Sequence, residues 1–256
     1  MAGNCVALLT DFGIADHFSA SMKGVILSIH PNAAIVDITH QVPPHDIETA
    51  AFLLFACYAD LPPETVFAAV VDPGVGSSRR AIAARSNGRY FVAPDNGLLS
   101  MILTDSSEIF EITNPKFTRE SISNTFHGRD IFAPAAAHLA AGRPISDIGP
   151  RIEDPILLPA LTPYPCDDAT VEGAIIHIDH FGNLITNLRA EHIPVGGRLA
   201  VGKHSISRFA SSYDEVPAGE PFAIVGSLGL IEISIDQGSA AQMLHASRGT
   251  SVRVLL

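Results

Sequence analysis

Residues 65–80 read TVFAAVVDPGVGSSRR. The leading run of apolar and β-branched residues predicts a buried strand over 65–71. Asp72 then precedes a Pro-Gly pair, so its backbone is biased to the extended region before the chain turns sharply. Ligands of open α/β sheets bind outside the carboxyl ends of the strands. We therefore interpret Asp72 as a candidate site residue, with Arg79 or Arg80 as its ion-pair partner.

The glycines of this turn would let a ligand approach the backbone closely. The stretch matches neither G-x-x-x-x-G-K-[ST] nor G-x-G-x-x-G at a strand-to-helix turn. An interpretation as a nucleoside triphosphatase or a dinucleotide-binding protein therefore loses its main support.

Outward from this stretch, short apolar runs alternate with segments of helical period. Strands are expected over 5–10, 33–38, 81–85 and 89–94, the last two joined by an SNG hairpin turn. Helices are expected over 17–30, 47–59, 97–103 and 129–142, with Asp16 and Asp46 as N-caps of the first two and Gly142 ending the last. The pattern predicts a Rossmann-like α/β domain over residues 1–148.

The composition changes after this region. Residues 149–169 carry five prolines, too many for a helix or a central strand, and predict a linker. Residues 170–256 hold short apolar runs separated by Gly, Pro and Asn, with one helical stretch over 239–244. They predict a small, barrel-like all-β domain.

Composition excludes several classes of partner. The 27 acidic and 16 basic residues give a formal net charge of -11, which repels nucleic acids and anionic membranes. No run approaches the roughly 18 apolar residues of a membrane span. The three cysteines, Cys5, Cys57 and Cys166, are too scattered for a disulfide framework or a paired-cysteine zinc site. We expect a cytoplasmic protein.

Further polar clusters stand beside predicted strands and helices. Asp11 follows the first strand, where it either holds vicinal hydroxyl groups or accepts hydrogen bonds from the following turn. His127 precedes the last helix, together with Arg129 and Asp130, and is either a general base or a loop histidine. Asp95 opens an Asp-Asn-Gly sequence that suits an Asx turn.

In the second half, residues 178–188 read IDHFGNLITNL. Phe181 with nearby amide side chains would suit a planar heterocycle, stacked on one face and hydrogen-bonded at its edge. The same letters also suit a hairpin turn between two strands. The residues alone leave both interpretations open.

Six stretches in register resemble one family, the S-adenosyl-L-methionine (SAM) hydroxide adenosyltransferases or SAM hydrolases, relatives of the fluorinating and chlorinating SAM enzymes. They are TDFG at 10–13, VDPGVGSSRR at 71–80, APDNGLL at 93–99, FHGRDIFAPAAAHLA at 126–140, IDHFGNLITNL at 178–188 and GSLGLIEISIDQGSAA at 226–241. The resemblance implies attack of water or hydroxide at the 5′ carbon of SAM, giving adenosine and L-methionine. It also implies that neither a metal nor an organic cofactor takes part.

The resemblance carries over an Asp-Arg-His set associated with the attacking water. Asp72, Arg79 and His127 match it, while Arg80 competes for the arginine role. Asp72 or His127 would accept the proton, and the arginine would stabilise a hydroxide-like species or fix the carboxylate.

For the ribose and the amino-acid end of SAM, the resemblance implies three carboxylates. Asp11 matches the residue that holds the ribose hydroxyls, and Asp16 and Asp179 match groups near the methionine ammonium. It further implies a homotrimer whose site lies between the N-terminal domain of one subunit and the C-terminal domain of the next.

For the adenine and the methionine carboxylate, Asn183 and Ser227 match the family's contacts. Phe181 is our assignment for adenine contact or packing. Leu228 departs from the arginine that follows this serine in halogenating relatives, so a guanidinium that could pair with the methionine carboxylate is lost.

Two alternatives stay open beside hydrolysis. The first is a 5′-halogenase. Fluorinating relatives have a sequence resembling YPATG where this chain has DPGVG, and an anionic Asp72 would repel a halide by about 1 to 4 kcal/mol at contact range, which favours hydrolysis. The second is a SAM- or adenosine-binding module without turnover. Such a module would need none of Asp72, Arg79 and His127, so the presence of all three argues against it.

Overall fold

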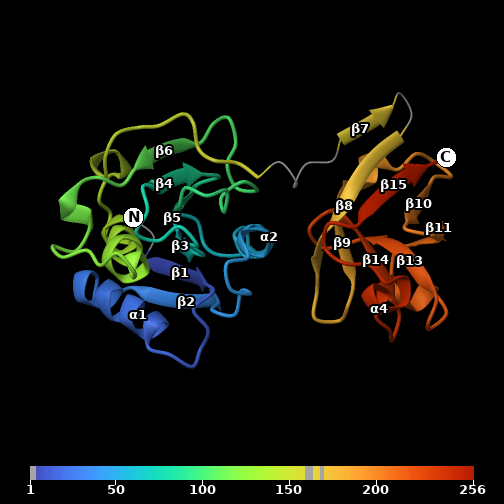
Figure 1. The fold of residues 1–256 in the computed structure, drawn as a ribbon, viewed down its shortest axis with the longest axis horizontal. Helices are drawn as coiled ribbons and strands as arrows, with labels where there is room; N and C mark the ends of the chain where they lie inside the picture. Colours follow the sequence, from blue (N-terminus) through green and yellow to red (C-terminus); the bar gives the residue numbers. More distant parts are fainter. Residues whose placement is uncertain (1–3, 159–163, 168–169) are drawn as a thin grey trace. The chain divides into compact units, whose positions relative to one another are not determined.

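The computed structural model describes residues 4–158, 164–167 and 170–256. The chain is a mixed α/β protein with two sheets, as predicted, and divides into two compact units, Met1–Leu158 and Pro159–Leu256 (Figure 1). The division falls within the proline-rich stretch. No helix of the described residues is long and apolar enough to cross a membrane.

The first unit is built on a six-stranded sheet in the order β2-β1-β3-β5-β4-β6. Strands β2, β1, β3 and β5 are parallel, while β4 runs antiparallel to β5 and β6. The strands are β1 (Cys5–Thr10), β2 (Ala34–Thr39), β3 (Val66–Val70), β4 (Ala81–Ser86), β5 (Arg89–Pro94) and β6 (Glu108–Glu111).

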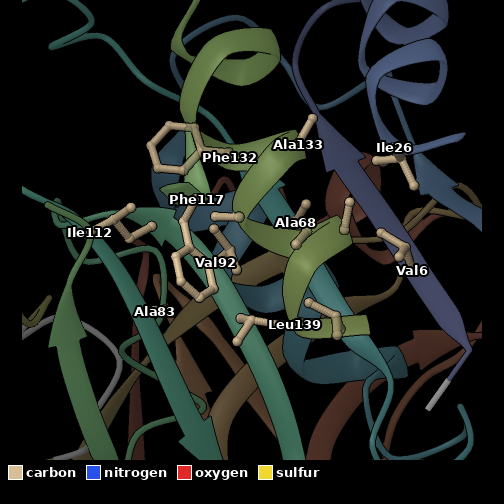
Figure 2. Packing of buried hydrophobic residues seen from close by; sticks show 14 of the residues in the cluster. Val6, Ile26, Ala68, Ala83, Val92, Ile112, Phe117, Phe132, Ala133 and Leu139 are labelled. Carbon is tan, nitrogen blue, oxygen red and sulfur yellow. The ribbon is translucent and has the colours of Figure 1, made fainter. Parts of the chain in front are cut away.

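Helices cover both faces of this sheet. The α-helices are α1 (Phe18–Ile29), α2 (Ile47–Cys57) and α3 (Ala133–Ala140), and the short helical turns are η1 (Pro115–Phe117), η2 (Gly128–Phe132) and η3 (Ile145–Asp147). Val6 of β1 packs with α1 and α3 on one face (Figure 2), and Ala7 packs with α2 on the other. Successive side chains of a strand point to opposite faces, so burial on both sides explains the uninterrupted apolar runs of β1 and β3.

Local signals place several of these elements. Asp46 caps α2 as predicted, because its Oδ1 accepts a hydrogen bond of 3.0 Å from the Thr49 amide. Asn87 and Gly88 both adopt positive φ between β4 and β5, which is the two-residue hairpin that the SNG sequence predicts. Gly142, with φ +87°, ends α3.

Three sequence-based expectations are wrong. Asp16 does not cap α1, which begins at Phe18 after His17. Residues 97–103 form successive turns instead of a helix, because the amides of Ser100 and Ile102 bond to carbonyls three residues back. The last helix begins with the π-helical turn η2, and only Ala133–Ala140 is α-helical.

The second unit carries a nine-stranded, strongly curled sheet, ordered β11-β10-β15-β8-β9-β14-β13-β12, with β7 added beside β8. Within the described residues of this unit, neighbouring strands are antiparallel except for β12 with β13. The strands are β7 (Tyr164–Asp167), β8 (Thr170–Ile178), β9 (Leu184–Arg189), β10 (Arg198–Val201), β11 (His204–Ile206), β12 (Phe209–Ala210), β13 (Pro221–Val225), β14 (Leu230–Ile235) and β15 (Ser251–Leu255).

One α-helix of this unit, α4 (Ala240–Leu244), packs on the core of the sheet and lies within the stretch predicted to be helical. Two short 3-10 turns accompany it, η5 (Ala190–His192) and η6 (Tyr213–Glu215). Strand β7 falls inside the stretch predicted as a linker, of which residues 159–163 and 168–169 lie outside the described part of the chain.

Candidate active site

A cavity of about 310 Å³ opens at the carboxyl ends of β1 and β3 in the first unit. Four loops and the start of α1 line it with Asp11, Phe12, Phe18, Pro44, His45, Val70, Asp72, Val75, Thr125, Phe126, His127 and Gly128. Three residues singled out from the sequence, Asp11, Asp72 and His127, therefore meet at one cavity. The parallel strands bring them together because each follows or packs beside a strand end at the same edge of the sheet.

Arg79 joins Asp72 to His127. Its Nε donates to Asp72 Oδ1 at 2.8 Å, its Nη2 donates to Asp72 Oδ2, and the same Nη2 donates to His127 Nδ1 at 2.7 Å. The side chains of Asp72 and Arg79 are only 6% and 10% exposed, and the guanidinium lies 5.1 Å from the centroid of the Phe132 ring. A planar guanidinium fits this task because it can present parallel N–H groups to a carboxylate and a further N–H to a third group.

Arg80 lies in a different network. Its Nε donates to Asp95 Oδ2 and its Nη1 to Asp154 Oδ1, both at 2.8 Å. The sequence matched Arg79 to the family's arginine and kept Arg80 as a competitor, and in the structure the partner of Asp72 is Arg79.

The contact with Arg79 determines the hydrogen-bonding state of His127. Because a guanidinium has donors only, Nδ1 must accept, so the imidazole is neutral and carries its proton on Nε2. Burial and the charge of Arg79 hold the pKa of His127 below its usual range, against the opposite effects of Asp72 and Asp130. His127 therefore presents an N–H donor from its free side.

Asp11 is held by a segment far along the chain. Its Oδ2 accepts a hydrogen bond of 2.9 Å from the backbone amide of His45. The amide of Phe12, next in the chain, instead donates to Thr10 Oγ1. The donor is thus distant in sequence, and the alternative in which the turn after Asp11 supplies it has no support among these contacts.

His45 is a cavity residue that the sequence did not single out. Its φ of +67° is left-handed, which is unusual for a residue other than glycine, and its side chain is 74% exposed. The sequence offered only a histidine after two prolines, counted among the scattered histidines, with no signal of its backbone conformation.

Asp16 does not join this group. The residue is exposed and does not line the cavity of the first unit. The described contacts give it no neighbour among the other predicted site residues.

In the second unit, a separate hollow of about 740 Å³ is lined by Asp179, Phe181, Asn183 and Ser227, among others. Asp179 Oδ1 accepts from the amides of Phe181 and Asn183, each at 2.9 Å, and its Oδ2 accepts from Asn183 Nδ2 at 2.8 Å. The hairpin turn predicted from these letters is therefore present. Phe181 in this turn is 74% exposed, so the hairpin turn also leaves an aromatic ring available for stacking.

Glu232 is a further lining residue of this hollow that sequence reasoning missed. Burial and the neighbouring Asp179 raise the pKa of its carboxyl group. Gly226 makes room for it, because a Cβ there would lie 1.8 Å from Glu232 Oε1. Its charge in β14, where only Ser234 is also polar, was the available signal.

The described residues, 4–158, 164–167 and 170–256, contain no group of three or more His, Cys, Asp or Glu side chains that could hold a metal ion. The burial of Cys57 raises the pKa of its thiol to about 11, which makes it a poor nucleophile near neutral pH.

Two protein-family models match the chain. The SAM hydroxide adenosyltransferase N-terminal domain matches residues 6–149, and the corresponding C-terminal domain matches residues 173–253. Among solved structures, an uncharacterized conserved protein from Thermotoga maritima superposes with a TM-score of 0.88 at 36% identity, covering 98% of this chain and 100% of that one.

Curated relatives span nearly the whole chain. The (R)-S-adenosyl-L-methionine hydrolase of Thermus thermophilus is 40% identical over 259 residues, covering 98% of this chain and 99% of the relative. The protein of the same name from Salinispora arenicola is 39% identical, with 97% of each chain covered. A fluorinase of Actinoplanes is more distant, at 28% identity over 287 residues, with 97% of this chain and 96% of the relative covered. The chain belongs to the SAM hydroxide adenosyltransferase family.

Proposed function

We propose that this protein hydrolyses SAM to adenosine and L-methionine by attack of water at the 5′ carbon. The observation that carries the proposal is the bridge from Asp72 through Arg79 to His127 at the wall of the cavity. Binding of an adenosyl group alone would not need this set. The full-length relatives named (R)-SAM hydrolase support the same reaction and the (R) configuration at sulfur.

The reaction asks little of the protein at the leaving group. The water oxygen forms a bond to C5′ while the C5′–S bond breaks. The electron pair of the C5′–S bond goes to sulfur. The positively charged sulfonium leaves as a neutral thioether, so no acid is needed to protonate it. The protein's task is to hold the water opposite the sulfur at near-attack distance and to receive the proton that the water loses.

The polar groups at the cavity suit this task. The oxygens of Asp72 retain lone pairs beyond their contacts with Arg79, so the carboxylate can accept a hydrogen bond from the water and then its proton. The Nε2–H of His127 can donate to the water oxygen and fix its direction. We assign the base to Asp72, because His127 already uses Nδ1 to accept from Arg79.

The remaining contacts to SAM follow the family pattern. We assign the ribose hydroxyls to Asp11 and the methionine ammonium to Asp16 and Asp179. Phe181 and Asn183 would contact the adenine. The Phe181 ring is exposed, and the hydrogen bond from Asn183 Nδ2 to Asp179 fixes the orientation of the Asn183 amide.

We assign the methionine carboxylate to Ser227, which is exposed at the hollow of the second unit. Leu228 offers no guanidinium there. The amino-acid end would therefore be held by hydrogen bonds with no cationic partner from this position.

We also propose that the first unit is a Rossmann-like domain, that the second is a barrel-like β domain, and that the enzyme is a cytoplasmic homotrimer working without a cofactor. In the trimer, the cavity of one subunit would face the second unit of its neighbour. Exposed apolar side chains support such a cover, with Ile14 73% and Val75 36% exposed in the loops around the cavity.

The test is incubation of the purified protein with (R)-SAM in oxygen-18 water. We expect adenosine labelled at the 5′ hydroxyl, released together with methionine, and a slower reaction of the (S) epimer. Mass spectrometry of the nucleoside reads the label, and light scattering on the same sample reads the oligomeric state, expected to be a trimer.

Added chloride or fluoride separates the alternatives in the same assay. Halogenated 5′-deoxyadenosine in excess of adenosine would identify a halogenase. Calorimetric binding of SAM with no adenosine would identify a binding module, and a fully active monomer would remove the trimer.

Acidification should lower the activity and the stability together. His127 must be neutral to accept from Arg79, so we expect kcat/KM to fall as the pH drops through the lowered pKa of His127 in the folded enzyme, which lies below the usual histidine value of about 6.5. The lowered pKa in the folded state means that the unfolded chain binds this proton first, so folding begins to lose stability as the pH falls below the usual histidine pKa of about 6.5 and goes on losing it down to the lowered pKa of the folded state.

The measurements are a pH profile of kcat/KM and thermal melts of the wild type and of His127→Asn. The variant should lose less stability on acidification than the wild type, because it lacks the titrating imidazole. Equal acid sensitivity of the two melts would contradict the assignment.

A further inference from the structure

Asp130 is a fully buried carboxylate three residues after His127. Its side chain is 0% exposed. Its Oδ1 accepts from Arg129 Nε at 2.7 Å, and its Oδ2 accepts from Arg129 Nη2 at 3.0 Å and from the Ser123 amide at 2.9 Å. Arg119 Nη1 lies 3.5 Å from Oδ1. These partners hold the pKa of Asp130 below its usual range despite its burial.

The backbone of Asp130 ties down the same loop a second time. Pro134 has no N–H, so it cannot make the helical hydrogen bond to the carbonyl four residues earlier, which is that of Asp130. That oxygen accepts instead from the amide of Arg119 at 2.9 Å. The Asp130 amide donates to the carbonyl of Phe126. One residue thus holds Arg119, Ser123 and Phe126 against the π-helical turn.

This turn supports the wall of the cavity. Thr125, Phe126, His127 and Gly128 all line it, and the guanidinium of Arg129 lies 5.0 Å from the centroid of the Phe126 ring. The turn packs closely against Phe12, since a Cβ on Gly128 would lie 3.0 Å from the Phe12 ring. π-Helical turns occur often at functional sites, where they place a side chain that an α-helical turn would point elsewhere.

A buried ion pair is a poor device for stability alone, because desolvation offsets most of its attraction. Its directional hydrogen bonds instead fix one geometry of the loop. The partners of Asp130 lie on both sides of His127 in the sequence, so their hydrogen bonds restrain the segment that carries the imidazole.

We propose that Asp130 is a positioning residue for His127. Through Arg129, Ser123 and the carbonyl contact with Arg119, it holds the loop so that His127 Nδ1 receives the N–H of Arg79 and Nε2–H faces the cavity. Its catalytic consequence rests on the proposed SAM hydrolysis, whereas its effect on the imidazole does not.

The test is Asp130→Asn, a substitution of nearly equal size that can still accept from the Ser123 amide but no longer pairs with Arg129. We expect kcat for SAM hydrolysis to fall about 10- to 100-fold with KM changed less than about 3-fold, as for a small misplacement of a reacting group. Selective nitrogen-15 labelling of histidine reads the imidazole directly. The Nε2–H tautomer of His127 should dominate in the wild type and give way to a mixture in the variant.

Asp95→Asn is the matched control. Asp95 is also buried, and its carboxylate also pairs with an arginine, Arg80, and with a backbone amide, that of Ile156. We expect a comparable loss of thermal stability, with kcat within about 3-fold of the wild type and the His127 signals unchanged. Arg129→Lys keeps the charge but not the fork, and serves as a milder second variant, with an expected loss in kcat of about 3- to 10-fold.

Wild-type kcat together with a wild-type His127 tautomer in Asp130→Asn would overturn the proposal. Loss of activity in both Asp130→Asn and Asp95→Asn in proportion to lost stability would also overturn it. If the wild type does not hydrolyse SAM, the proposed function fails, and the nitrogen-15 spectra still decide whether Asp130 positions His127.

Discussion

Asp72→Asn is expected to lower kcat for SAM hydrolysis by about 10²- to 10⁴-fold, the usual range for loss of a proton acceptor that also fixes the reacting groups. The amide keeps one oxygen for Arg79 but turns its N–H groups toward a guanidinium that offers only donors. Arg79 is then free to move, and the hydrogen bond to His127 Nδ1 loses its fixed geometry.

Single-turnover assays with (R)-SAM measure the chemical step, and calorimetry measures SAM binding, which we expect to weaken less than 10-fold. Asp154→Asn is the control, because it removes a highly exposed carboxylate paired with Arg80, and it should retain activity within about 2-fold. A kcat above one tenth of the wild type in Asp72→Asn would falsify the assignment of Asp72 as the base.

Side-chain periodicity and turn chemistry carried most of the prediction of the first unit. The apolar runs at 5–10 and 65–71 predicted strands, which β1 and β3 form, and both strands pack against α1 and α3 on one side and α2 on the other. Asp46 and the Asn87-Gly88 turn were predictable because each depends on contacts within a few residues.

The errors arise where contacts distant in sequence override local preference. Residues 97–103 are apolar at helical spacing, yet their contacts with Leu158 lie far along the chain. Ser100 Oγ accepts a hydrogen bond from the Leu158 amide, and Gly97 packs closely against the Leu158 side chain. The π-helical turn depends on Arg119 taking the carbonyl that Pro134 leaves free. Neither partner could be read from the local sequence.

Of the residues predicted for the site in the first unit, Asp11, Asp72 and His127 line one cavity, whereas Asp16 does not. Asp11, Asp72 and His127 stand near strand or helix ends, where topology brings them together. The contribution of His45 depends on a left-handed backbone conformation and on an amide 34 residues from Asp11, which no local pattern signals. The choice between adjacent arginines likewise depends on the turn after Asp72, since neighbouring residues of an extended chain point in opposite directions.

That choice gives the second large expected effect. Arg79→Lys should lower kcat by about 10²-fold, because an ammonium keeps the charge but lacks the planar fork that serves both oxygens of Asp72 and Nδ1 of His127 together. Arg80→Lys is the matched substitution one residue away. It should lower kcat by less than about 3-fold and lower Tm, since Arg80 ties Asp95 to Asp154 at the edge of the first unit.

Single-turnover rates, SAM binding and thermal melts of the two variants separate geometry from charge. If charge near the cavity were sufficient, Arg79→Lys would keep most of its activity, and the bridge would be a structural ion pair. If Arg80→Lys were the more damaging change, the catalytic arginine would be Arg80 in spite of its distant partners. The expected result is a large loss of kcat in Arg79→Lys with its fold intact and SAM still bound. A guanidinium is then required because it holds the carboxylate and the imidazole in one fixed arrangement around the attacking water.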